Sequence, residues 1–313
     1  MNFINSFNTI GKKIKHHLNI AKPEQIFPLN PELPLPEGVS EQQLFNFLAT
    51  VLVSDAPPIE MANYCRQDFR RFVYTYGMTR GLSGDCLELG ANPYFTTILL
   101  QNFTDLKLTL ANYFGDNYPN NCSQEVRYKN LKSDEYLSIN LSFHHFNIES
   151  DIFPFNDQQF DVILFCEILE HLLMNPVGVL KEIKRILKPN GALILTTPNV
   201  SRLENVARMM AGANIYDPYS GYGPYGRHNR EYNKHEIYLL LQHVGFSIDS
   251  MFTADVHSNE ANNYHPIANL EPLLKPRELD LGQYIFVRAL NTHPARNKKP
   301  AFLYRSYPSE ELE

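Results

Sequence analysis

The sequence lacks a surplus of positive charge and any apolar run long enough to span a bilayer. It carries 28 lysines and arginines against 34 acidic residues, a formal net charge of −6. Nucleic acid is a disfavoured partner, because a phosphate backbone attracts basic surfaces. No apolar stretch approaches the roughly 20 residues of a transmembrane helix. We therefore expect neither a nucleic-acid partner nor a transmembrane segment.

Closely spaced cysteines are also missing. None of Cys65, Cys86, Cys122 and Cys166 forms a CxxC pair, and Cys86 and Cys166 lie inside apolar segments. Buried free thiols in a reducing compartment are the simplest account of this pattern, so the predicted location is the cytoplasm.

No metal-ligand spacing stands out. His144 and His145 alternate along a predicted strand and therefore point to opposite faces, while His16–His17 lack a third ligand at helical spacing. The cluster of adjacent acids that a catalytic magnesium would want is not evident. The sequence therefore predicts no structural metal and leaves a catalytic magnesium open.

Glycine is scarce where a nucleotide-binding turn is expected. In residues 84–100, GDCLELGANPYFTTILL, a short apolar run ends at Gly90, and helical spacing resumes after Tyr94. This pattern predicts a buried parallel strand, a tight turn and a helix N-terminus, the unit that holds nucleotide-like cofactors. The dinucleotide fingerprint needs three glycines, and Asn92 and Tyr94 occupy the later positions. An ordinary strand-to-helix turn therefore remains open for this stretch alone.

The rest of the chain divides by composition and periodicity. We expect an N-terminal arm and proline-rich linker at 1–40, a helical cap at 41–80, a main domain at 81–292 and a tail at 293–313. The start of the arm is compatible either with a basic amphipathic helix on anionic lipid or with a solvated terminus. Residues 200–232, rich in glycine, tyrosine and cations, are expected to form an irregular lid.

Apolar strands and amphipathic helices alternate through the main domain. Strands are predicted near 86–89, 106–111, 142–146, 160–166, 192–197, 246–250 and 284–290, and helices near 176–188 and 234–244. This alternation predicts a doubly wound α/β sheet, whose ligands bind at the carboxyl ends of the strands.

Four stretches resemble the class I S-adenosylmethionine-dependent methyltransferases. They are CLELGAN, FNIESDIFPFNDQQFDVILFCEILEHL, VLKEIKRILKPNGALILTTPN and RHNREYNKHEIYLLLQHVGF, which together span most of residues 84–250. The last stretch is similar to bacterial members that modify small molecules or sugars. The resemblance implies a Rossmann-like, mostly parallel seven-stranded sheet with an antiparallel last strand, and S-adenosylmethionine as the cofactor.

The resemblance also implies which residues bind the cofactor. In chain order they are Glu88, Gly90, Asn92, Asn112, Tyr113, Asn147, Ile148, Glu149, Cys166 and Glu167. Asn112 stands where the family usually has an acid that grips the ribose, with Asp116 as a nearby substitute. An amide lacks the charge-assisted strength of a carboxylate. A nicotinamide enzyme needs that carboxylate too, so this interpretation is disfavoured.

Two histidines are candidates for chemistry at the rim of the sheet. His171 follows the fourth predicted strand and is the leading general base, because histidine titrates near working pH. His228, inside the lid, is the second candidate. A purely structural role for either histidine is the alternative. The predicted acceptor contacts from the lid are Tyr222, Tyr225, Arg227, Arg230 and Tyr232, because arginine suits anionic groups and tyrosine suits sugars or rings.

These features predict methyl transfer from S-adenosylmethionine to a small molecule, with a hydroxyl of a sugar or glycan precursor preferred. The alternative is a methyltransferase-like domain that has lost turnover and serves as a binding or scaffold protein. A homo-oligomer is left open.

Overall fold

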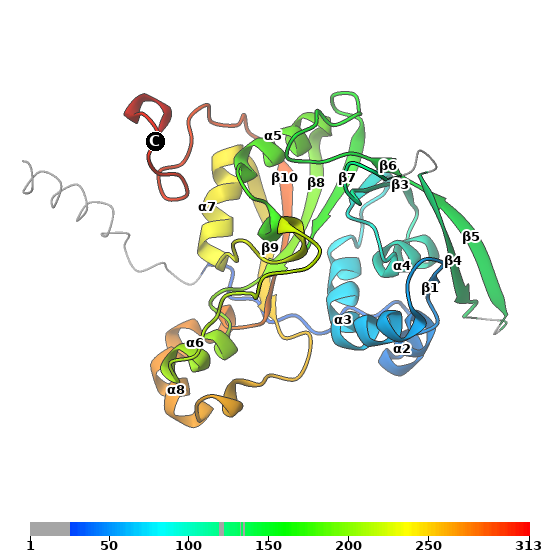
Figure 1. Ribbon diagram of the computed structural model, residues 1–313, viewed down its shortest axis with the longest axis horizontal. Coiled ribbons are helices and arrows are strands. Elements are labelled where there is room, and N and C mark those ends of the chain that lie inside the picture. Colours follow the sequence, from blue (N-terminus) through cyan, green and yellow to red (C-terminus); the bar gives the residue numbers. More distant parts are fainter. Residues whose placement is uncertain (1–25, 119–121, 132, 134) are drawn as a thin grey trace, which may run out of the picture.

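A seven-stranded sheet with helices on both faces forms the centre of the molecule (Figure 1). In spatial order its strands are β6 (His144–His145), β3 (Leu106–Asn112), β2 (Gly84–Leu89), β7 (Phe160–Cys166), β8 (Leu187–Pro198), β10 (Tyr284–Asn291) and β9 (Phe246–Ala254). Strand β10 runs antiparallel to β8 and β9, and the other neighbouring pairs are parallel. The predicted fold class, including its antiparallel last strand, is confirmed.

The structure, a computed structural model, describes residues 26–118, 122–131, 133 and 135–313. The predicted basic N-terminal segment, with His16–His17, lies outside these residues. Within the described part of the chain, no helix combines the length and the apolar character needed to cross a membrane.

Two helical layers cover the sheet. One layer holds α3 (Pro58–Met78) and α4 (Phe95–Phe103), with α2 (Glu41–Leu48) beside them, and α5 (Pro176–Ile186) and α7 (Lys234–Val244) lie on the opposite face (Figure 1). Side chains of β2 alternate between the two layers: Cys86 belongs to the core with α3 and α4, and Leu87 and Leu89 to the core with α5 and α7. Burial on both faces explains the continuous apolar runs of these strands.

A second, antiparallel sheet was not expected from the sequence. It consists of β1 (Leu52–Val53), β4 (Ser123–Lys129) and β5 (Tyr136–Ser142). The prediction of one strand over 142–146 was therefore wrong in its bounds, because Ser142 ends β5 and only His144–His145 pair with β3. Burial alternates along β4, where Val126 and Tyr128 are buried between exposed neighbours, as a strand covered on one face requires.

The helix predicted over 176–188 ends earlier than expected. Helix α5 ends at Ile186, and β8 begins directly after it at Leu187. Leu187 is buried, and its backbone is in register with Phe160 of β7. The Lys-Pro-Asn-Gly segment is thus the start of a strand, with Asn190 at a positive φ of 60°.

The predicted lid is only partly irregular. It contains α6 (Leu203–Met210) and the short helix η2 (Pro224–Gly226). Helix α6 packs against a segment that the sequence analysis did not anticipate, made of η3 (Ala261–Asn263), α8 (Ile267–Leu274) and η4 (Lys275–Asp280). Ala207, Ala261 and Leu270 form its small buried core.

Gly245 provides a test of how the C-terminal tail is held. It ends α7 at a φ of +88°, and a Cβ at this position would lie 2.3 Å from the backbone oxygen of His293. Gly212, just past α6, has a φ of +75° with open space around it. We expect Gly245→Ala to lower the free energy of unfolding by roughly 3 kcal/mol and Gly212→Ala by about 1 kcal/mol, measured by urea denaturation. Equal losses of unfolding free energy in the two variants would show that the close approach of Gly245 to the C-terminal tail does not contribute to stability.

Candidate active site

A cavity of about 180 Å³ lies where the strand order of the sheet reverses, at the carboxyl ends of β2, β3 and β7. Ligands of doubly wound sheets bind at this switch point. Its lining consists of Leu89, Gly90, Ala111, Asn112, Tyr113, Phe146, Asn147, Ile148, Glu167, Ile168, His171, Leu172 and Tyr225.

Many of the residues predicted from the sequence meet at this cavity. They are Gly90, Asn112, Tyr113, Asn147, Ile148, Glu167, His171 and Tyr225. Sequence reasoning missed the apolar part of the lining, namely Leu89, Ala111, Phe146, Ile168 and Leu172. Each of these residues is the chain neighbour of a predicted residue, so the predicted strand ends could have identified them as part of the lining.

Gly90 turns the chain at the floor of this cavity. Its φ is +65°, and its backbone N–H donates to the carbonyl of Ala111 at 2.8 Å. A Cβ here would lie 3.0 Å from Cδ1 of Ile168. The glycine therefore provides both the turn and the room in which Ile168 packs over the strand end.

Asn112 belongs to a chain of hydrogen bonds. Its Oδ1 accepts from the backbone N–H of Asn92 at 2.9 Å, and its Nδ2 donates to the Tyr94 hydroxyl at 3.1 Å. That hydroxyl donates to Gln124 Oε1 at 2.5 Å, and Gln124 Nε2 donates to Asp55 Oδ2 at 2.6 Å. Asn112 therefore faces the cavity with a fixed orientation. Asn92 binds this network and does not line the cavity.

Glu88, Glu149 and Cys166 also lie outside the lining. Glu88 is buried on the α4 side of β2, where its carboxylate accepts from the Thr97 hydroxyl at 2.6 Å. Burial raises the pKa of Glu88 to about 8. Glu149 accepts from the backbone N–H groups of the turn at 173–175. Burial raises the pKa of the Cys166 thiol to about 12, so this thiol is not a nucleophile.

Glu167 follows β7 with an unusual backbone, a φ of +55°. Its Oε1 accepts from the Thr196 hydroxyl at 2.7 Å. Burial raises the pKa of this carboxyl, and the Arg71 guanidinium opposes that rise. A non-glycine residue in this conformation is held by its surroundings, which is common at functional sites.

The two candidate histidines lie side by side, with ring centroids 5.0 Å apart. His171 ends the short helix η1 (Leu169–His171), and its Nδ1 donates to the carbonyl of Arg227 at 2.9 Å. His228 Nδ1 donates to Glu231 Oε1 at 2.9 Å. Burial and the neighbouring His228 lower the pKa of His171, whereas the carboxylates around His228 raise the pKa of that residue.

Backbone hydrogen bonds attach the lid to η1. The backbone N–H groups of Asn229 and Arg230 donate to the carbonyl of Glu170 at 2.8 and 3.1 Å. Asn229 Nδ2 donates to the carbonyl of His171 at 2.9 Å. The position of His228 relative to His171 is thus set by the main chain on both sides.

The predicted acceptor residues divide into separate groups. Tyr225 lines the 180 Å³ cavity, where its ring edge faces Tyr113 with centroids 6.1 Å apart. Tyr222 is 92 % exposed, and the Arg227 guanidinium lies over Tyr219. Tyr232 is only 3 % exposed and lies in the core beneath the lid. The structure therefore does not bring Tyr232 to either the cavity or the surface.

A second cavity, of about 480 Å³, is lined by His228 and not by His171. Its lining includes His228, Asp217, Tyr216 and Arg230, and Arg230 also pairs with Glu236 at 2.6 Å. His171 lines the first cavity and His228 the second. The histidine pair therefore stands between two hollows.

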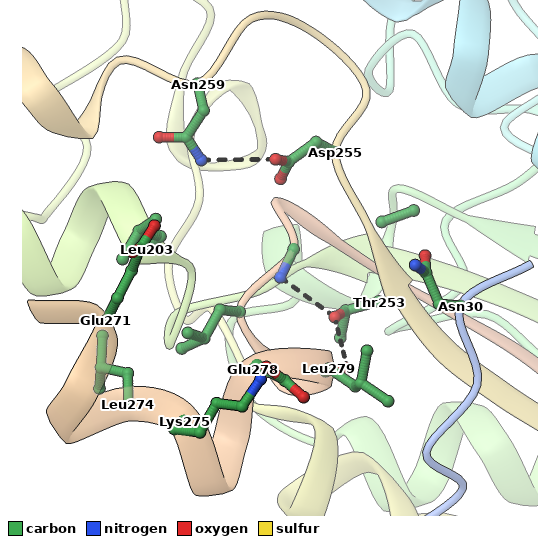
Figure 2. A pocket seen from close by; sticks show the side chains of 13 residues that line it. Asn30, Leu203, Thr253, Asp255, Asn259, Glu271, Leu274, Lys275, Glu278 and Leu279 are labelled. Carbon is green, nitrogen blue, oxygen red and sulfur yellow. Dashed lines mark hydrogen bonds and ion pairs between the residues drawn. The ribbon is translucent and has the colours of Figure 1, made fainter. Parts of the chain in front are cut away.

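A third cavity, of about 410 Å³, lies between β9, α8 and η4 (Figure 2). Several of its polar side chains already bind each other: Asn259 donates to Asp255, and Lys275 pairs with Glu278. None of the predicted site residues lines it. The switch-point cavity is therefore the candidate active site.

A family model described as "Methyltransferase domain" matches residues 61–251, more than half of the chain. The chain belongs to the methyltransferase domain family. The resemblance to class I methyltransferases is thus confirmed, while the sugar-type subfamily is not specifically supported. Membership implies S-adenosylmethionine as the cofactor of this methyltransferase. No curated protein matches the chain.

Solved methyltransferase structures align with the chain at low identity. A SAM-dependent methyltransferase from Archaeoglobus fulgidus has 15 % identity and a TM-score of 0.43, covering 70 % of this chain and 91 % of its own. One from Thermotoga maritima has 13 % identity and a TM-score of 0.45, covering 80 % and 100 %. One from Methanosarcina mazei has 14 % identity and a TM-score of 0.40, covering 68 % and 93 %. Identities this low carry no information on the acceptor.

Glu88 should make the stability of this methyltransferase depend on pH. The folded protein holds a proton up to a pKa of about 8, whereas the unfolded chain releases it near pH 4.3. The contribution of Glu88 to stability therefore falls as pH rises between these values. Glu88→Gln should remove this loss and gain roughly 2–4 kcal/mol over the wild type between pH 5 and pH 8, measured by urea denaturation.

Glu32→Gln, at an exposed carboxylate, is the matched control and should leave the pH dependence unchanged. A Glu88→Gln curve parallel to that of the wild type would show that Glu88 ionises normally in the folded protein.

Proposed function

We propose that this methyltransferase transfers a methyl group from S-adenosylmethionine to a hydroxyl of a small molecule, with a sugar or glycan precursor as the acceptor class. The observation that carries the proposal is the His171–His228 pair, which stands between the switch-point cavity and the second cavity. One hollow is suited to the cofactor, the other to the acceptor.

The lining of the first cavity suits S-adenosylmethionine in its chemistry. Ile148, Phe146 and Leu172 offer apolar surface for the adenine ring. The amides of Asn147 and Asn112 can hydrogen-bond to the adenine edge and the ribose hydroxyls. Gly90 allows the rest of the cofactor to lie against the end of β2.

Entry of the cofactor requires a movement of the lid. A volume of 180 Å³ is below the roughly 300 Å³ at which ligand pockets usually begin. Tyr225 comes from η2, and its hydroxyl receives a long hydrogen bond of 3.4 Å from Asn147 Nδ2. This contact is weak enough for Tyr225 to swing away when the cofactor binds.

His171 is the proposed base for a hydroxyl acceptor. A carbonyl can only accept, so the hydrogen bond to Arg227 fixes the ring proton on Nδ1 and leaves a lone pair on Nε2. The bound sulfonium supplies an electrophilic methyl group and leaves as a neutral thioether. As the oxygen–carbon bond forms and the sulfur–carbon bond breaks, Nε2 of His171 takes the hydroxyl proton.

The second cavity supports a hydroxylated acceptor. The carboxylates of Asp217 and Glu231 provide acceptors for hydroxyl groups, and Tyr216 provides an aromatic face. This mixture of polar groups and an aromatic ring is the chemistry that recognises sugars.

A non-catalytic binding protein is the second candidate. The small volume of the first cavity and the engagement of Asn112 by Asn92 and Tyr94 favour it, because both oppose tight cofactor binding. The donors and acceptors left on Asn112, and the lone pair on His171, favour the enzyme.

Ligand binding separates the two candidates. S-adenosylmethionine and its demethylated product, each at about a hundredfold over Kd, should stabilise the folded chain by roughly 2.7 kcal/mol, and NAD should not. Thermal unfolding with each ligand measures this. No shift with any of them would favour the binding protein and reject the enzyme.

His171→Ala should leave the affinity for S-adenosylmethionine within about twofold and lower kcat for an alcohol acceptor by roughly 100- to 10,000-fold. In the wild type, the acid limb of the pH profile should lie below pH 6.5, because the pKa of His171 is lowered. Steady-state kinetics from pH 5 to 9 test both expectations. The exposed His293→Ala is the control, and an equal rate for His171→Ala would remove this residue from the mechanism.

A further inference from the structure

Glu170, the residue before the proposed base, is a carboxylate with an unused oxygen in the protein interior. Its side chain is fully buried. Oε2 accepts from the Thr197 hydroxyl at 2.9 Å, but Oε1 has no hydrogen-bond partner among the described residues. A buried carboxylate oxygen without a partner costs free energy, and a cation bound to that oxygen offsets the cost.

The unused oxygen faces the histidine pair. His171 Nε2 lies 3.9 Å from Glu170 Oε1. One ligand atom from each of Glu170, His171 and His228 lies within 4.8 Å of the other two. Zn²⁺ and similar ions bind nitrogen and carboxylate oxygen at about 2.0–2.2 Å, so ligands on one ion lie at most about 4.4 Å apart. The 4.8 Å within which the three ligand atoms lie is close to this limit.

Both imidazoles are oriented as metal ligands usually are. His171 donates its Nδ1 proton to the carbonyl of Arg227, and His228 donates its Nδ1 proton to Glu231. A ligating histidine typically gives its other N–H to a carbonyl or carboxylate, which fixes the tautomer. Nε2 of each ring is left to coordinate.

We propose that Glu170, His171 and His228 bind a first-row divalent cation of the Mn²⁺, Fe²⁺, Co²⁺ and Zn²⁺ class. Two imidazoles and one carboxylate suit these ions, whereas Mg²⁺ and Ca²⁺ prefer an all-oxygen shell. The sequence analysis did not identify this site because His228 lies far along the chain from the Glu-His pair. The fold brings them together.

Three protein ligands leave positions for a hydroxyl on the ion. Because His171 also lines the switch-point cavity, these positions lie at its rim. A hydroxyl on such an ion has a lowered pKa, so the bound ion would activate the acceptor hydroxyl that His171 deprotonates as a base in the metal-free protein. Binding of the ion itself does not depend on the identity of the methyl acceptor.

A neighbouring cluster of Asp217, His228 and Glu231 is a weaker candidate. Its carboxylates are already engaged: Glu231 forms an ion pair with Arg202, and Asp217 accepts from the backbone N–H of His228. Asp217→Asn is therefore a suitable control, because it alters the cluster that contains His228 and leaves Glu170 unchanged.

The test is a Co²⁺ titration of the tag-free full chain after EDTA treatment, without S-adenosylmethionine, followed by visible absorption and equilibrium dialysis. The wild type should bind one Co²⁺ per chain with a visible spectrum that EDTA abolishes. Glu170→Gln and His228→Ala should each raise the Kd about tenfold or more, and Asp217→Asn should stay within about twofold. A large excess of Mg²⁺ should not displace the ion.

Cooperative thermal unfolding shows whether each variant is folded. If either Glu170→Gln or His228→Ala fails to fold, the other still tests the site. The proposal is overturned if the wild type binds no more Co²⁺ than Glu170→Gln, or if Asp217→Asn abolishes binding while Glu170→Gln keeps it. Displacement by Mg²⁺ would overturn the assigned ion class. These outcomes are read without turnover, so failure of the methyl-transfer proposal is seen separately, in the ligand-stabilisation experiment.

Discussion

Burial of carboxylates at the carboxyl edge of the sheet is the constraint on which the site depends. Three glutamates lie here, Glu88 and Glu170 buried and Glu167 partly buried, and each receives a hydrogen bond from one threonine hydroxyl. The pairs are Glu88 with Thr97, Glu167 with Thr196 and Glu170 with Thr197. A single neutral donor offsets only part of the cost of removing a carboxylate from water, so the pKa of each is raised. This edge therefore holds protons or attracts cations, and the histidine pair lies directly beside it.

The lid is attached at the point where its position matters for chemistry. Arg227, Asn229 and Arg230 bind the main chain of η1 and the ring of His171, so hydrogen bonds on both sides of His228 place it, together with the contacts of its own ring with His171 and Glu231. Tyr225 has a long hydrogen bond from Asn147 and an edge contact with the ring of Tyr113. Because the part of the lid next to η1 is fixed and Tyr225 is loosely held, a ligand can enter without disturbing the arrangement around His171.

Whether a strand or helix could be predicted from the sequence depended on how many of its faces are buried. Strands such as Phe160–Cys166 are buried on both faces and were recognised from continuous apolar runs. Strand Tyr136–Ser142 is mostly exposed, and the segment from η3 to η4 is built of short helices that pack on α6 and the end of β9, so neither produced a clear period. The pairing of Glu170 and His171 with His228 depends on how the lid folds back, which no local pattern reports.

The amide at Asn112, which departs from the acid usual in the family, has a cause far from the cofactor. Asp55 can only accept, so Gln124 must turn its Nε2 toward Asp55 and its Oε1 toward Tyr94. The Tyr94 hydroxyl then donates to Gln124, and its oxygen can only accept from residue 112. A carboxylate at 112 has no proton to give, whereas an amide does. The direction of hydrogen bonds that begins at Asp55 thus favours asparagine at 112, which keeps one donor and one acceptor free.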